Sequence, residues 1–235
     1  MATAAQPWRG SDSEGLPHEI SVEYASVLAA FAATVERNPA ATAIHYFDGA
    51  LSFRDLDERS DALAVALQER GFSRGDRLAL YLQNNPAFVV GLIAAWKAGG
   101  IAVAVNPMNL ERELAHVLGD SGARVLLCLD ELYERVARSV VERDGSTVAT
   151  VITCSPRDDQ TRGDARVFPP EVTSALSGRG ALTHERCDLS ALVAGFPGRR
   201  PTPEPLAASD TAMLVYTSGT TGMPKGSMSS HGNMA

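Results

Sequence analysis

One short segment concentrates the side chains of this chain that could bind a charged ligand. It reads Tyr216-Thr217-Ser218-Gly219-Thr220-Thr221-Gly222-Met223-Pro224-Lys225-Gly226. Glycine tolerates positive φ and lets the backbone approach a ligand, and successive N–H groups in such a turn converge on an anion. The hydroxyls add rotatable donors and Lys225 adds a mobile positive charge. The segment follows an apolar run, residues 212–216, so it predicts a polyphosphate-binding loop after a buried strand.

Two common phosphate-binding patterns do not fit this segment. A Walker A loop has glycine directly before lysine and a hydroxyl residue directly after it. Here Met223 and Pro224 separate Gly222 from Lys225, and Gly226 follows the lysine. The other pattern is the dinucleotide-binding G-x-G-x-x-G, which does not open a helix near the start of the chain. A P-loop NTPase and a Rossmann dehydrogenase are therefore disfavoured.

The segment resembles the phosphate-binding loop of the AMP-forming acyl-adenylating enzymes, which include acyl- and aryl-CoA ligases and the adenylation domains of peptide synthetases. The match runs without a gap over residues 216–226, with Ser227 as a mild departure after it. His231 and Asn233 fit the downstream His-x-Asn of that family. Residues 106–108, Asn-Pro-Met, are similar to the fatty-acid-activating branch.

The resemblance implies an ATP-dependent carboxylic acid:CoA ligase that forms an acyl-adenylate, with medium- or long-chain fatty acids as substrates. ATP, Mg²⁺ and CoA are the implied ligands. His231 is implied near the acyl pocket, with a packing role in the first turn of a helix as the open alternative. No protein metal site is implied. The implied phosphate-binding residues are Thr217, Ser218, Gly219, Thr220, Thr221, Gly222 and Lys225.

Several functional positions of that family have no match among the 235 residues. These are the adenine-contacting segment, the Thr-Glu pair, the ribose-binding aspartate and the C-terminal lysine. The resemblance thus implies the N-terminal part of a ligase, with no complete catalytic set and inactive by itself. A noncatalytic truncated remnant and a weak nucleotide-binding module are the alternatives from another class. Within the family, an aryl-CoA ligase or another adenylating enzyme is the alternative.

The composition limits the ligands and the cellular compartment expected for this protein. The formal net charge of −7 disfavours nonspecific binding to nucleic acid, which requires a basic face. The three widely spaced cysteines form no C-x-x-C and are typical of reduced thiols in a cytoplasmic protein. No signal peptide is visible, and the most apolar stretch, residues 91–105, is too short and interrupted to be transmembrane. The oligomeric state is not predicted.

The fold class follows from strands that alternate with helices. Apolar runs at residues 77–82, 101–105, 124–129 and 148–153 alternate with helical patterns at 86–99, 111–118 and 131–141. This order predicts an α/β domain whose mostly parallel sheet has helices on both faces. It corresponds to the N-terminal portion of the large domain of the acyl-adenylating enzymes. A hairpin is expected at residues 43–53 before this pattern begins.

The boundaries of four segments follow. Residues 1–17 are expected to be disordered, and residues 18–154 to form the α/β subdomain. Residues 155–209 are expected to form an irregular connector with a short helix at 188–195. Residues 210–235 are expected to begin the next subdomain with the phosphate loop.

Local signals mark the ends of several predicted helices. Ser52 followed by Asp55 predicts a capping box, and Asn109 is a candidate cap for the helix at 111–118. Acidic residues cluster in the early turns of the helix after Ser52 and are predicted to lie on a solvated face. There their negative charges interact favourably with the positive end of the helix dipole. They are Asp55, Asp57, Glu58 and Asp61.

Overall fold

A computed structural model describes residues 22–161, 186–217 and 223–235. The predicted disordered segment, residues 1–17, lies outside these ranges. Among the described residues, one sheet of seven strands forms the centre of the molecule, in the order β7-β6-β5-β3-β4-β8-β9. All neighbouring strands are parallel except β8 and β9. The predicted α/β class with a mostly parallel sheet is confirmed.

The strands of this sheet are short. Their bounds are β3 Arg77–Tyr81, β4 Ile101–Val105, β5 Val125–Leu129, β6 Thr150–Cys154, β7 Arg186–Asp188, β8 Thr211–Thr217 and β9 Lys225–Ser230. Central strands are apolar on both faces because helices cover both sides of a parallel sheet. On β3, Leu78 and Leu80 enter one core cluster while Ala79 and Tyr81 enter the other.

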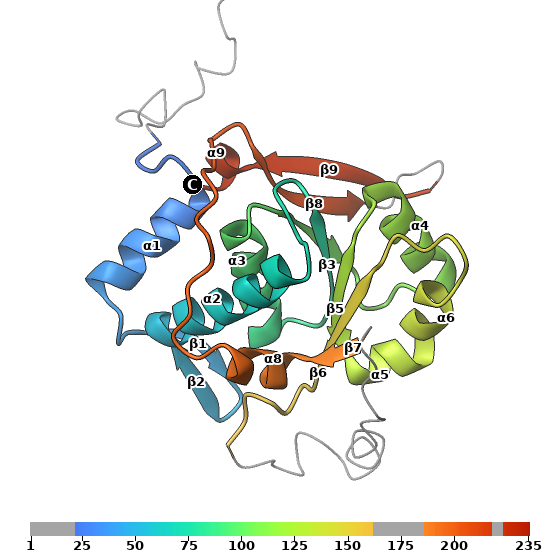
Figure 1. Ribbon diagram of the computed structural model, residues 1–235, viewed down its shortest axis with the longest axis horizontal. Helices are drawn as coiled ribbons and strands as arrows, with labels where there is room; N and C mark the ends of the chain where they lie inside the picture. Colours follow the sequence, from blue (N-terminus) through green and yellow to red (C-terminus); the bar gives the residue numbers. More distant parts are fainter. Residues whose placement is uncertain (1–21, 162–185, 218–222) are drawn as a thin grey trace, which may run out of the picture.

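Two layers of helices enclose the sheet. In Figure 1, α2 and α3 lie on one side of the central strands, and α4 and α6 lie on the other. Four helices belong to the α3 side of the molecule: α1 Val27–Arg37, α2 Phe53–Glu69, α3 Pro86–Lys97 and α8 Leu189–Gly195. Those on the other side are α4 Glu111–Ser121, α5 Asp130–Leu132, the π-helical turn η2 Tyr133–Ala137 and α6 Arg138–Val141. The last helix, α9, spans His231–Met234.

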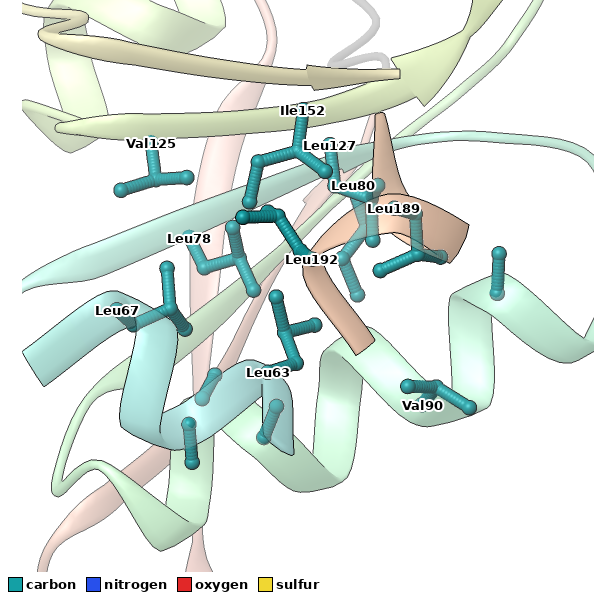
Figure 2. Close-up of a cluster of buried hydrophobic side chains, with 14 of the residues drawn as sticks. Leu63, Leu67, Leu78, Leu80, Val90, Val125, Leu127, Ile152, Leu189 and Leu192 are labelled. Carbon is teal, nitrogen blue, oxygen red and sulfur yellow. The ribbon is translucent and has the colours of Figure 1, made fainter. Parts of the chain in front are cut away.

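The larger core cluster lies between the sheet and the α2–α3 layer. Figure 2 shows Leu63 and Leu67 from α2 pointing toward Leu78 and Leu80 of β3. Leu63 is completely buried. Side chains of α8 close the same cluster, so part of the connector between β6 and β8 belongs to the core.

Of the two helix caps predicted from the sequence, one is confirmed. Ser52 and Asp55 form the capping box of α2, with the Ser52 N–H donating to Asp55 Oδ2 at 2.7 Å. Asn85 caps α3 by accepting from the Phe88 N–H at 3.0 Å. The prediction for Asn109 is wrong, because Leu110 is the N-cap of α4 and no side chain caps that end.

A hairpin precedes the sheet. β1 (Thr42–Tyr46) and β2 (Gly49–Ser52) are antiparallel, as predicted for this region. Phe47 and Asp48 form the turn between the two strands. Phe47 takes a φ of 52°, and Gly49 already pairs with Tyr46 in the ladder.

The acidic residues of α2 do not all face solvent, which corrects the prediction. Asp57 and Asp61 have side-chain exposures of 15% and 7%, and both accept hydrogen bonds from Lys97 on α3. Their spacing of four residues puts them on one face of the helix, which is the face that packs against α3. Asp55 keeps the predicted role at the helix start.

The described parts of the predicted connector, residues 155–161 and 186–209, include one helix and one strand. The predicted short helix is present as α8, capped by Asp188, whose side chain accepts from the Ala191 N–H. β7 was not predicted; it is a parallel partner of β6. β8 and β9 extend the same sheet on its other side. The division into four segments stays a prediction.

Two further features concern the described residues as a whole. Cys128, Cys154 and Cys187 are free thiols, and the first two are buried. Burial raises the pKa of the Cys154 thiol well above its usual value. No described helix has both the length and the apolar character needed to cross a membrane.

Candidate functional site

The two ends of the predicted phosphate loop are neighbours at the end of a strand pair. β8 ends at Thr217, β9 begins at Lys225, and these two residues pair in the antiparallel ladder. Both are exposed. The loop between them therefore starts and finishes at one point on the sheet edge. The remaining predicted contacts, Ser218, Gly219, Thr220, Thr221 and Gly222, lie outside the described residues, so their roles stay predictions.

Helix α4 contacts the chain on both sides of this loop. Tyr216 Oη donates to Asp120 Oδ2 at 2.6 Å, and His116 Nε2 lies 2.8 Å from the carbonyl oxygen of Pro224. A carbonyl only accepts, so Nε2 of His116 carries the proton in this contact. Arg112 lies close to the Met223 sulfur, with Nη2 to Sδ at 3.6 Å.

Tyr216 fits tightly between α4 and β9. Its ring is nearly perpendicular to that of His116, with centroids 6.2 Å apart. On its other side it lies against Gly226, where a Cβ would come within 3.1 Å of Tyr216 Cζ. Burial is the main cause that raises the pKa of the Tyr216 phenol, and the hydrogen bond to Asp120 is the second. The phenol therefore remains a neutral donor. A side chain at position 226 would therefore press on the tyrosine ring, which would have to shift by a few tenths of an ångström.

His231 occupies a different environment, in the first turn of α9. Its side chain is completely buried, and neither ring nitrogen has a hydrogen-bond partner among the described residues. Its ring meets Trp96 edge-on, with centroids 5.7 Å apart. Burial lowers the pKa of His231, against a smaller opposing effect of Asp210, so the imidazole is held neutral.

The structure does not bring Lys225 and His231 together. They lie at opposite ends of β9, and a strand rises about 3.4 Å per residue, which places their backbones about 20 Å apart. His231 instead belongs to the apolar contact between α3, β8 and α9. There the Trp96 indole N–H donates to the carbonyl of Ala212 at 2.8 Å. The predicted loop and the predicted acyl-pocket residue are thus separate features of one strand pair.

The α4 residues were not identified from the sequence. Arg112, His116 and Asp120 are four residues apart, a spacing that places them on one face of a helix. The opposite face holds buried Leu114, Val117 and Leu118. The polar stripe was therefore a readable signal. The partners of this stripe could not be read from the sequence, because β8 and β9 are distant from α4 along the chain.

A separate cavity of about 310 Å³ lies where β6 ends, between α2, α3 and α8. Arg59 forms an ion pair with Asp159 at this cavity. Three residues predicted to bind phosphate or to line the acyl pocket are described, and none of them lines this cavity: Thr217, Lys225 and His231. The lining residues are Arg59, Ala87, Val90, Cys154, Ser155, Asp158, Asp159, Leu189, Ser190, Val193 and Ala194.

Comparison with known proteins assigns the family. The family model described as AMP-binding enzyme matches residues 31–235. The chain belongs to this family of AMP-binding enzymes. A long-chain-fatty-acid–CoA ligase from Salmonella typhimurium is 32% identical over 229 residues, covering 97% of this chain and 40% of that protein. The protein of the same name from Bacillus subtilis is 30% identical over 237 residues, with the same coverage. The chain thus spans about 40% of the length of these relatives.

Solved structures agree on the fold. The anthranilate CoA ligase AuaEII in complex with anthranoyl-AMP has a TM-score of 0.70 at 19% identity, covering 90% of this chain and 36% of that one. The Mycobacterium tuberculosis fatty acyl CoA synthetase has a TM-score of 0.66 at 19% identity, covering 90% and 36%. These matches support the α/β architecture.

Proposed function

We propose that this chain contributes the ATP-phosphate-binding loop of an AMP-forming carboxylic acid:CoA ligase. The observation that carries the proposal is the β8–β9 pairing of Thr217 with Lys225. It closes the ends of a Gly/Ser/Thr-rich segment at a sheet edge. Membership of the AMP-binding enzyme family and the ligase relatives support it. Thr217 through Gly222 and Lys225 are the proposed phosphate-binding residues.

The chemistry of the proposed reaction explains this set of residues. The carboxylate of the acid attacks the α-phosphorus of ATP, the bond to the bridging oxygen breaks, and pyrophosphate leaves. The thiol of CoA then attacks the acyl carbon and releases AMP. Backbone N–H groups, hydroxyls and a lysine promote the first step by positioning the triphosphate and offsetting the charge of the leaving group.

We propose that Mg²⁺ enters the site as part of the substrate, bound to the phosphates of ATP. No three His, Cys, Asp or Glu side chains form a metal site within the ranges that the structure describes. Mg²⁺ commonly binds through substrate phosphates and few protein carboxylates.

Medium- or long-chain fatty acids are the proposed acyl substrates. The support is the name shared by the ligases from Salmonella typhimurium and Bacillus subtilis, together with the Asn-Pro-Met segment. His231 is a proposed residue near the acyl chain, since a buried neutral imidazole beside Trp96 suits an apolar neighbour. An aryl acid is the alternative substrate.

A binding measurement tests the nucleotide proposal on the 235-residue chain. We expect calorimetry to show saturable binding of Mg-ATP that pyrophosphate competes away. Lys225→Ala should weaken it about tenfold, as expected for losing a charged hydrogen bond. Arg37→Ala, an exposed cation at the end of α1, is the matched control and should leave binding unchanged. Absence of Mg-ATP binding by a folded chain would contradict the proposal.

A turnover assay tests the second part of the proposal. The family's adenine-contacting, ribose-binding and C-terminal lysine positions have no match among the 235 residues. We therefore propose that the 235-residue chain does not complete the reaction alone. Incubation with dodecanoate, Mg-ATP and CoA should release no pyrophosphate above background. Release that depends on the acid would show instead that this chain is a self-sufficient ligase.

A further inference from the structure

Three polar residues on one face of α4 touch the two segments that flank the proposed phosphate loop. Asp120 accepts from the Tyr216 hydroxyl on the β8 side. On the β9 side His116 contacts the carbonyl of Pro224, and Arg112 contacts the sulfur of Met223. One rigid helix therefore holds both ends of the loop.

We propose that His116 and Asp120 are positioning residues for nucleotide binding, which fix the distance and direction at which the chain leaves β8 and enters β9. The proposal rests on the proposed function of the loop. Neither residue is proposed to touch the nucleotide. Each acts through another residue, His116 through Pro224 and Asp120 through Tyr216.

The ladder alone does not define these ends. An antiparallel pair continues only to Thr217 and Lys225, which are exposed and form its last paired residues. Pro224 has no N–H to donate, so it cannot strengthen the ladder through its own nitrogen. Its carbonyl is instead held by His116, at 2.8 Å. The hydrogen bond from α4 thus fixes the residue just before Lys225.

The Tyr216 contact fixes the other end. Its ring is confined between His116 and Gly226, and its hydroxyl is held by Asp120. The residue after it, Thr217, begins the proposed phosphate-binding set. Because α4 is anchored to the sheet by buried Leu114 and Val117, a shift of either loop end requires breaking contacts to a rigid element.

Hydrogen exchange of the free chain tests whether α4 holds these ends. We expect His116→Leu and Asp120→Ala to speed amide exchange in peptides covering residues 211–217 and 223–230 about fivefold, the effect of losing one net hydrogen bond. His116→Gln keeps a donor at the position of Nε2 and should restore slow exchange. Glu111→Gln is the matched control, because Glu111 on the same helix pairs with Arg143 and not with β8 or β9.

Mg-ATP binding supplies the functional readout. His116→Leu and Asp120→Ala should weaken binding about fivefold, whereas His116→Gln and Glu111→Gln should stay within twofold of the wild type. Unchanged exchange in both peptides would overturn the proposal. So would faster exchange throughout β3, β4 and β5, because that indicates general destabilisation. Faster exchange at the two ends with unchanged Mg-ATP affinity would also overturn it.

The two proposals fail in different ways. If the wild-type chain does not bind Mg-ATP, the proposed function is lost, and with it the functional meaning of the α4 contacts. The exchange data would then still decide whether α4 fixes the loop ends. If the wild type binds Mg-ATP and the α4 variants bind equally well, the proposed function stands and the positioning role is wrong.

Discussion

Lys97 on α3 and Asp61 on α2 form a buried ion pair, with Nζ 2.7 Å from Oδ1 and side-chain exposures of 9% and 7%. Asp57, one turn earlier on α2, lies 2.6 Å from the same ammonium group. The Lys97 ammonium also lies 5.7 Å from the centroid of the Phe31 ring of α1. Three helices therefore meet at one charge, and Lys97 is a structural residue in this fold.

Removing this charge should destabilise the protein strongly. Lys97→Met leaves the carboxylates of Asp57 and Asp61, which only the exposed Arg200 among the described residues still approaches, at 3.6 Å. Losing one partner of a buried pair costs about 3 kcal/mol of unfolding free energy. Urea denaturation measures this. The matched control is Arg135→Met, which breaks the exposed pair with Glu131 and should cost about 0.5 kcal/mol or less. Equal losses in both variants would contradict the assignment.

The α2 cap is a second point of stability. Ser52→Ala removes the hydroxyl that accepts from the Asp55 N–H at 3.1 Å, and the loss should be about 1 kcal/mol. Ser52→Thr keeps a hydroxyl and should retain most of the stability. The same denaturation experiment compares both with the wild type. If threonine lowers stability as much as alanine, the cap does not explain the effect.

The main core should be sensitive to the loss of volume. Leu63→Ala removes a completely buried side chain from the cluster drawn in Figure 2 and should cost about 3 kcal/mol. Leu110→Ala, at a residue 64% exposed, is the control and should change stability by about 0.5 kcal/mol at most. Thermal and urea unfolding both report this difference. A small effect of Leu63→Ala would mean that the core relaxes around the cavity.

His231 should make stability depend on pH. Burial lowers its pKa in the folded protein, whereas an unfolded histidine titrates near about 6.5. The unfolded chain therefore takes up a proton first as the pH falls, so the free energy of unfolding decreases below about pH 6.5. Comparing urea unfolding at pH 7.5 and 5.5 should show a smaller decrease in His231→Phe than in the wild type. Equal decreases would show that His231 is not responsible.

Local signals in the sequence predicted much of the fold. Apolar runs such as residues 101–105 predicted strands, and Ser52 with Asp55 predicted a helix start, because these features depend on neighbours in the chain. β7 was missed because it has three residues and no periodicity of its own. β9 was missed because Lys225–Ser230 is polar; among the described strands it pairs with β8 alone. β7 is defined by its long-range pairing with β6, and β9 by its hairpin pairing with β8, rather than by the preferences of their own residues.

The candidate site shows the same limit. The motif predicted that Thr217 and Lys225 belong to one phosphate-binding site, and the β8–β9 ladder places these two residues opposite each other. Their support by His116 and Asp120 depends on how α4 packs against the β8–β9 pair, which no spacing within either segment encodes. The buried carboxylates of α2 were misread for the same reason, since the partner Lys97 lies on another helix.

The antiparallel β8–β9 pair also has a consequence for the order of folding. Its two strands are joined by a short segment and can associate locally, on the microsecond scale of an isolated hairpin. The β4–β8 pairing joins parts of the chain that are far apart and incurs a larger loop-closure entropy. The hairpin is therefore expected to form as a preassembled unit, which docks late onto a sheet already started by β3, β4 and β5.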